Sequence, residues 1–360
     1  MGTVIRKTAG GGALSLYREK RRKARALTAF LAAALPAAAL LSLGQGVMGV
    51  PPDWTVRIVA GKIAGIPSLY AGFPAGAAAV IWEIRLPRII CGLCIGAALG
   101  ASGVIFQAIL QNQLADPYTV GVSSGASFGA SLAIFCNTVL AWHLPITPAA
   151  LAFAGLTLAA VIFIAERGNG FQTTNLIMAG IIVSAFFQAG LSFLKMLSGE
   201  NVSAIVFWLM GSLAGRDWKD AALLAFTLIP ALTLAVVFSG SLNILSLGER
   251  EAQSLGMNAK RTRFLFLLLG ACMTAVCVSV AGIIGFVGLV VPHLLRFSVS
   301  SDNRLLTPLA ALLGAILLSA ADMAVRLIGT GEIPVGVLTT LLGGPFFIWV
   351  FMKRKNGERV

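Results

Sequence analysis

The residues that could do chemistry are few in this chain, and they are scattered. The sequence of 360 residues contains 14 Asp and Glu, two His and five Cys. A metal site needs several converging donors, but His143 and His293 are far apart in the sequence. Cys91 and Cys94 form a CxxC pair inside an apolar stretch, where thiols lack the access that redox chemistry needs. No GxxxxGK[ST] phosphate loop occurs. The sequence therefore predicts no metal site, no bound cofactor and no enzymatic activity.

One polar segment stands out in this apolar chain, Leu242 to Arg263, with the sequence LNILSLGEREAQSLGMNAKRTR. Ser246 and Glu249 stand at capping-box spacing. Gly248 and Gly256 each offer a place to end a short helix. We expect two short helices at a membrane surface, shaped to dock against a soluble partner. An ordinary connecting loop is the alternative.

The composition determines the kind of element that positions this segment. Hydrophobic residues make up 58% of the chain, charged residues only 11%, and the mean hydropathy is +0.90. A soluble domain carries roughly 25% charged residues, so lipid must be the solvent. With about 20 residues per span, we expect an all-α polytopic membrane protein with about ten transmembrane helices. The spans are predicted at 27–50, 85–110, 121–141, 149–167, 173–197, 221–238, 264–281, 283–297, 307–328 and 337–352.

Three features between the spans are also expected. In the outer stretch 51–83, Asp53 could cap an amphipathic helix that carries Val56, Val59 and Ile63. The apolar piece 202–210 is too short to cross a membrane and should form a short re-entrant or surface helix on the outer side. The glycine steps at the start of the span that begins at 121 should allow a close helix neighbour.

Basic residues are concentrated at both ends of the chain and give a net charge of +13. Eight precede the first span and four follow the last one. This positive-inside pattern predicts that both termini are cytoplasmic and that the number of spans is even. We divide the chain into a basic cytoplasmic N-terminal segment 1–26, a transmembrane domain 27–352 and a cytoplasmic tail 353–360.

The spans contain little that could couple transport to an ion gradient. A secondary transporter would usually carry ionisable residues near mid-membrane. Asp322 and Arg326 form the main pair, one helical turn apart, and can neutralise one another. If the chain transports a solute, we therefore expect the energy to arrive through a partner at the segment 242–263. An ion-coupled secondary transporter remains the alternative from another class.

Eight motifs, in order, resemble those of the iron-chelate (FecCD-type) permease family, the membrane subunits of type II ABC importers for iron–siderophores, haem and cobalamin. The motifs are WEIRLPR at 82–88, GVIFQAILQNQLADPYTVGVSSGA at 103–126, NLIMAGI at 175–181, FWLMGSLAGRDW at 207–218, LGEREAQSLGMN at 247–258, GFVGLVVPHLLR at 285–296, ADMAVR at 321–326 and EIPVGVLTTLLGGPFFIWV at 332–350. Gln113 replaces the family's usual proline, but the turn-capping Asn112 and Asp116 are present.

The resemblance implies a function and a set of partners. The chain would be the permease of an ATP-driven importer in the bacterial plasma (inner) membrane, with an iron–siderophore or haem favoured over cobalamin as cargo. It would pair with a second copy, most simply as a homodimer, and with two ATP-binding subunits that use ATP and Mg. A soluble substrate-binding protein would deliver the cargo. The lipid bilayer surrounds the chain, and nucleic acid is not expected as a partner.

The resemblance also implies roles for residues. The expected contacts with the ATPase are Ser246, Gly248, Glu249, Arg250, Glu251, Ala252, Leu255 and Gly256. Three arginines at the outer mouth would meet carboxylates of the binding protein: Arg85, Arg88 and Arg326. The alternative is interfacial snorkelling for Arg85 and Arg88, and pairing with Asp322 for Arg326. Three residues would narrow the cytoplasmic gate, with simple N-capping as the alternative: Thr173, Thr174 and Asn175.

Overall fold

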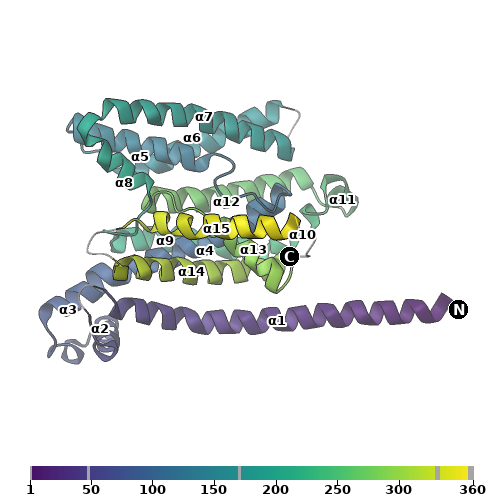
Figure 1. The fold of residues 1–360 in the computed structure, drawn as a ribbon, viewed down its shortest axis with the longest axis horizontal. Helices are drawn as coiled ribbons and strands as arrows, with labels where there is room; N and C mark the ends of the chain where they lie inside the picture. Colours follow the sequence, from purple (N-terminus) through teal and green to yellow (C-terminus); the bar gives the residue numbers. More distant parts are fainter. Residues whose placement is uncertain (1, 47–48, 169–171, 329–332, 356–360) are drawn as a thin grey trace.

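The computed structural model describes residues 2–46, 49–168, 172–328 and 333–355, and every regular element in these ranges is helical (Figure 1). The α-helices are α1 Gly2–Gly44, α2 Pro52–Ala64, α3 Ala75–Ala79, α4 Leu86–Ile109, α5 Val122–Val139, α6 Ile146–Arg167, α7 Thr173–Leu197, α8 Val202–Leu209, α9 Trp218–Val237, α10 Ser239–Leu245, α11 Glu249–Ser254, α12 Ala259–Ala281, α13 Val287–Ser298, α14 Asn303–Ile328 and α15 Val335–Lys355. The long helices run side by side. We call the end with α10 and α11 the inner end and the end with α2 and α3 the outer end.

The prediction of about ten membrane-spanning helices is confirmed. Within the described residues, eight helices are long and apolar enough to cross a membrane: Arg18–Gly44, Gly76–Ile109, Val122–Val139, Ile146–Arg167, Thr173–Leu197, Trp218–Val237, Ala259–Ala281 and Asn303–Ile328. Two shorter apolar helices, Val287–Ser298 and Val335–Ile348, cover the two remaining predicted spans. The short outer helix expected at 202–210 is α8.

Helix α4 is the centre of the bundle and packs against α9, α12, α13 and α14. A stripe of small residues allows this close packing. A Cβ atom on Gly96 would collide with the carbonyl group of Gly314 on α14. A Cβ atom on Gly103 would collide with the carbonyl of Gly288 on α13. The backbones therefore touch directly, as small residues permit in membrane helices.

Helices α5, α6 and α7 form a second layer beside this core (Figure 1). The glycine steps predicted at the start of α5 do meet a close neighbour, which is α6. A Cβ atom on Gly125 would collide with the Thr157 side chain, and one on Gly129 with the side chain of Phe153. Helix α12 contacts both α5 and α6 and also α4, so it joins the two layers.

Several predicted span boundaries are wrong, two of them in the first part of the chain. Helix α1 ends at Gly44 rather than near Val50, and it continues without a break through the basic residues before Leu27. Lys, Arg and Glu are good helix formers, so the change in composition does not end the helix. The membrane-spanning helix that includes α4 begins at Ala75 instead of Arg85. It consists of α3, a π-helical turn at Val80–Arg85, and α4.

The predicted outer helix exists as α2, but its expected cap is wrong. Pro51 precedes the helix and Pro52 occupies its first position, where a missing N–H costs nothing. Asp53 therefore lies in the first turn instead of capping it. Val56 and Ile63 are exposed, whereas the face with Ile58 is buried.

The predicted start of the span at 283–297 is also wrong, because Ile283–Phe286 is not helical. Gly282 and Phe286 both have positive φ angles, 73° and 67°. The Tyr118 hydroxyl donates to the Ile284 carbonyl at 2.7 Å and accepts from the Ile284 N–H at 3.3 Å. Non-helical backbone is tolerated inside a membrane protein where other groups satisfy it, and Tyr118 has this role here.

Candidate functional site

The segment predicted to dock on a soluble partner contains two short helices, α10 and α11, as expected. We call them the α10–α11 unit. Gly248, at φ 122°, separates the helices. Gly256, at φ 81°, ends α11 with the two hydrogen bonds of a Schellman motif: its N–H donates to Gln253, and the Met257 N–H donates to Ala252. Both glycines therefore allow the bends that the sequence predicted.

The predicted capping box in this unit is wrong. Ser246 ends α10, and its hydroxyl donates to the Leu242 carbonyl at 2.7 Å. Gly248 is the residue that precedes α11, and no side chain caps that helix. The Ser-x-x-Glu spacing is present, but the bend at Gly248 assigns Ser246 to one helix and Glu249 to the next.

One face of the α10–α11 unit packs against the bundle, and the other face is exposed. Ala252 is completely buried, as is Leu242. Arg250, Glu251 and Leu255 are exposed, with 63% of Leu255 open to solvent. Of the eight predicted contacts, Ala252 therefore packs against the bundle and is not accessible to a partner. Arg250, Glu251 and Leu255 form an exposed surface that is partly apolar and partly charged. Leu247, which is not one of those eight residues, also belongs to this surface and is 62% exposed.

Asn243 binds the unit to the start of α14. Its Nδ2 donates to Asp302 Oδ1 at 2.6 Å, and its Oδ1 accepts from the Asn303 N–H at 2.8 Å. Asp302 Oδ1 also accepts from the Arg304 N–H at 3.0 Å, so it caps α14. Sequence reasoning missed Asn243 and Asp302. The capping position of Asp302 before an apolar helix was a local signal, but its pairing with Asn243 was not.

Two further contacts bind the unit to the bundle. Arg263 of α12 is 3% exposed and reaches Glu249 Oε2 of α11 at 3.1 Å. Gln111, in the turn after α4, donates to the Leu245 carbonyl at the end of α10 at 3.0 Å. Glu249, predicted as an ATPase contact, thus forms an ion pair within the chain, while 41% of its side chain stays exposed. The unit is connected to α4, α12 and α14 at once.

The three predicted docking arginines come together at the outer end. Arg88 donates to Asp322 through Nε and Nη2, at 3.0 and 2.9 Å. Arg326 donates through Nε to the other Asp322 oxygen at 3.2 Å, which confirms the expected neutralising pair. Arg326 Nη1 also donates to the carbonyls of Ser42 and Gln45 at 3.0 Å. We call these residues, with Arg85, the outer arginine cluster.

The side chains of the outer arginine cluster are mostly buried. The Asp322 side chain is only 3% exposed, and those of Arg88 and Arg326 are 13% and 12% exposed. Arg85 is 6% exposed and donates to the Leu43 carbonyl at 2.7 Å. The cluster therefore joins the outer ends of α1, α4 and α14. A role in docking stays a prediction.

The predicted gate residues begin α7. Thr173 is its first residue, and Gln172 stands at the cap position without a side-chain cap. Thr174 is exposed, and Asn175 donates to the Gly168 carbonyl across the turn from α6. Asn175 thus joins the start of α7 to the end of α6, and the part of the three residues in a transport path stays a prediction.

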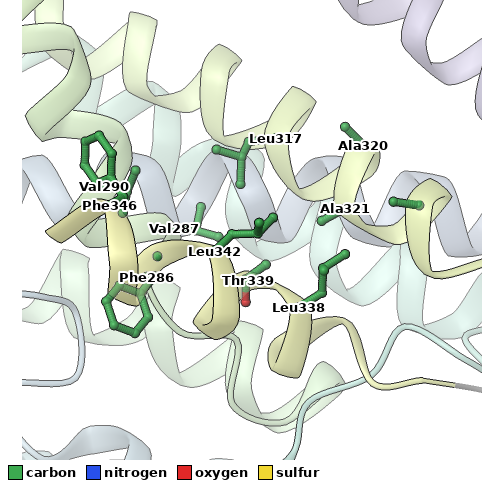
Figure 2. Close-up of a pocket in the computed structure, with 12 residues that line it drawn as sticks. Phe286, Val287, Val290, Leu317, Ala320, Ala321, Leu338, Thr339, Leu342 and Phe346 are labelled. Atoms are coloured by element: carbon green, nitrogen blue, oxygen red, sulfur yellow. The ribbon is translucent and has the colours of Figure 1, made fainter. Parts of the chain in front are cut away.

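The bundle also contains an apolar pocket of about 410 Å³ between α13, α14 and α15 (Figure 2). Phe286, Val290, Leu342 and Phe346 line it, and Thr339 supplies a hydroxyl. Such a lining offers no charge and no metal ligand. In the part of the chain that the structure describes, no three His, Cys, Asp or Glu residues lie close enough together to hold a metal ion.

Comparison with known proteins gives a consistent result. The model of the FecCD transport family matches residues 34–353. A cobalamin import system permease protein, BtuC of Halobacterium salinarum, is 39% identical over 81% of this chain and 79% of its own length. The Fe(3+) dicitrate transport system permease protein FecD of Escherichia coli is 37% identical over 92% of this chain and 99% of its own length.

A solved structure has the same fold. It is an ABC transporter of the metal-chelate type in an inward-facing conformation, 33% identical in sequence. The superposition has a TM-score of 0.79 and covers 91% of this chain and 99% of the other. The fold of this chain is therefore shared with a solved ABC transporter.

Proposed function

The chain belongs to the FecCD transport family, and on this premise we propose that it is the permease of an ATP-driven importer for a metal chelate, an iron–siderophore or haem. The α10–α11 unit is the observation that carries the proposal. It is bound to three parts of the bundle, yet it exposes Leu247 and Leu255 beside Arg250 and Glu251. Apolar side chains ringed by charges are typical of protein interfaces. The partner would be an ATP-binding subunit.

The contacts of the unit suggest how its movement could reach the membrane helices. A displacement of α11 would pull on α12 through the Glu249–Arg263 ion pair. A displacement of α10 would pull on α14 through Asn243. We propose that two copies of the chain and two ATP-binding subunits assemble, and that ATP-driven closure of these subunits moves both helices. ATP and Mg would bind to the partner subunits only.

The inner end would then be cytoplasmic, in a bacterial plasma membrane. The N-terminal part of α1 and the C-terminal part of α15 both lie towards this end (Figure 1), and the basic residues at both ends of the chain agree with the positive-inside pattern. The gate would lie on the same side. There we propose that Thr173, Thr174 and Asn175 narrow the path.

A soluble binding protein would dock at the outer end, above the outer arginine cluster. A guanidinium group has five N–H donors, so a partner carboxylate could bind Arg88 while Asp322 still holds it. Arg85 and Arg326 would set the position of α1 and α14 under the binding protein. Their intramolecular bonds support a positioning role at least as well as direct contact.

The cargo is proposed from chemistry and from the relatives together. A chelate carries its own metal ligands, so a path with apolar and small polar walls is sufficient. The relatives named above transport cobalamin in one case and Fe(3+) dicitrate in the other, at similar identity to this chain. Cobalamin therefore remains the alternative within the family. An ion-coupled mechanism is less well supported, because Asp322 is paired with two arginines.

The test is uptake into vesicles that contain the chain, its ATPase and its binding protein. An iron–siderophore, haem and cobalamin are offered in parallel, with and without ATP. We expect ATP-dependent uptake of one cargo, and its loss when Arg250→Ala and Glu251→Ala are combined. The matched control combines Asp53→Ala with Arg57→Ala, an exposed acid and arginine on α2, and should bind the ATPase normally. Uptake that follows a proton or sodium gradient without ATP would refute the proposal.

A further inference from the structure

Helix α1 carries six basic residues within eight positions: Arg18, Lys20, Arg21, Arg22, Lys23 and Arg25. We call them the basic collar. All six are exposed, and the one acid among them, Glu19, pairs with Lys23 at 2.8 Å. Successive residues of an α-helix are rotated by about 100°, so the six cations point to all sides of the helix. The collar therefore has no single face.

The length of α1 gives the depth of the basic collar. Helix α1 ends at Gly44, and the stretch 25–44 covers about 30 Å at 1.5 Å per residue. This equals the thickness of the hydrocarbon core of a bilayer, about 30 Å. If Gly44 lies at the outer boundary of that core, Arg25 lies at the inner boundary. The collar then occupies the next ~12 Å, at the level of the lipid headgroups.

The packing of α1 places the collar where the helix leaves the bundle. Ala24 is completely buried and Leu31 is 6% exposed, both in the main core. Figure 1 shows the N-terminal part of α1 projecting beyond the other helices at the inner end. Most of the circumference of the helix at the collar is consequently open to its surroundings.

We propose that the basic collar binds anionic phospholipid headgroups in the leaflet at the inner end. Charge complementarity supports this occupant, because clusters of Lys and Arg beside a transmembrane helix attract anionic lipids. A protein partner would contact one face, whereas headgroups surround a helix on every open side. The collar precedes residues 34–353, which the family model matches. The collar therefore lies outside the part of the chain that the family model matches.

Such binding would hold α1 at both ends. At the outer end, Arg326 and Arg85 bond to the carbonyls of Ser42, Gln45 and Leu43. At the inner end, the basic collar would fix the depth of the helix against the headgroups. The edge helix of the bundle would then keep its depth in the membrane while the other helices move.

The experiment measures lipid binding by the purified full chain in nanodiscs of phosphatidylcholine, with and without phosphatidylglycerol. Lipids retained after mild extraction are identified by native mass spectrometry at low and high salt. The test variant combines Arg21→Gln with Arg22→Gln and keeps the other four cations, so that membrane insertion is preserved. The control combines Lys260→Gln with Arg261→Gln, two exposed cations at the start of α12 at the same end.

We expect wild type and control to retain phosphatidylglycerol selectively, and high salt to reduce that selectivity. The collar variant should retain it at least about tenfold less strongly. Equal retention by the collar variant and wild type would overturn the proposal, as would an equal loss in the control. So would a collar variant that keeps its lipid but loses binding to the ATPase in detergent, because the collar would then be a protein contact. None of these results depends on which cargo is transported.

Discussion

The α10–α11 unit and the outer arginine cluster lie at opposite ends of the bundle and are both bound to α14. At the inner end, Asn243 meets Asp302 and Asn303 where α14 starts. At the outer end, Asp322 near the end of α14 binds Arg88 and Arg326. The inner contacts are partly open, and they leave an exposed face on the unit. The outer contacts are nearly closed to solvent, and they pair the negative charge of Asp322 with the positive charges of Arg88 and Arg326.

This difference separates two ways of using polar groups in a membrane protein. A buried charge that loses its partner is strongly destabilising, so the outer arginine cluster is suited to holding α1, α4 and α14 together. Partly exposed hydrogen bonds contribute less to stability, so the inner contacts are suited to transmitting a movement. The following predictions test this contrast, from the largest expected effect to the smallest.

The largest effect is expected from Asp322→Asn. The substitution leaves the nearly buried side chains of Arg88 and Arg326 without a carboxylate partner. Breaking such a buried pair costs about 3–5 kcal/mol. The free energy or temperature of unfolding in detergent should fall accordingly, and α1 should become more accessible to protease.

The control for this prediction is Glu19→Gln, which removes the carboxylate of an exposed ion pair on α1. Its unfolding temperature should match that of wild type, since exposed pairs contribute little. If Asp322→Asn were as stable as wild type, the outer arginine cluster would not hold the three helices together. The contrast with the inner end would then be wrong.

A middle-sized effect is expected at Asn243. Asn243→Asp places two carboxylates together and removes the donor to Asp302, which should cost about 1–3 kcal/mol. The exchange Asn243→Asp with Asp302→Asn restores one donor and one acceptor, and it should recover most of the loss. Transported cargo per ATP hydrolysed is the second measurement. If the exchange rescued stability but not this ratio, Asn243 would transmit movement in a way that depends on its exact geometry.

The two glutamates of α11 should behave differently. Glu249→Gln weakens the contact with the buried Arg263 and should lower stability by about 1 kcal/mol, since Glu249 itself is 41% exposed. Glu251→Gln changes an exposed side chain, so it should leave the unfolding temperature unchanged and weaken binding to the ATPase. Both quantities are measured on both variants. If both variants changed the unfolding temperature and the binding to the ATPase in the same way, the unit would not have one face packed on the bundle and one exposed face.

Much of this architecture is predictable because it depends on local sequence. Apolar length predicts the spans, and Gly248 and Gly256 predict the ends of the short helices. The pairing of Asp322 with Arg326 follows from their spacing of one turn. The prediction of the capping box failed, although its spacing is also local, because the conformation of Gly248 decides which helix Ser246 joins.

The contacts that join distant parts of the chain were not predictable in the same way. Arg88 meets Asp322 across 234 residues, and Asn243 meets Asp302 across 59. The type of residue indicates that each needs a partner, but only the packing of α4 against α14 and α10 against α14 selects it. The structure brings the three arginines together at one end of the bundle, and their burial depends on this packing. Their predicted role in docking stays a prediction.

The smallest effect is expected at Gln111, where two contributions oppose each other. Its side chain donates to the Leu245 carbonyl at the end of α10, which also accepts from the Gly248 N–H at 3.2 Å. Its backbone, however, has a positive φ of 50°, which is unfavourable for any residue except glycine. Gln111→Ala keeps the strain and loses the bond, so it should cost about 1 kcal/mol. Gln111→Gly loses the same bond but relieves the strain, so its unfolding temperature should lie closer to wild type. If both variants lost uptake equally while differing in stability, the contact with Leu245 would matter for movement of the unit and not for its anchoring.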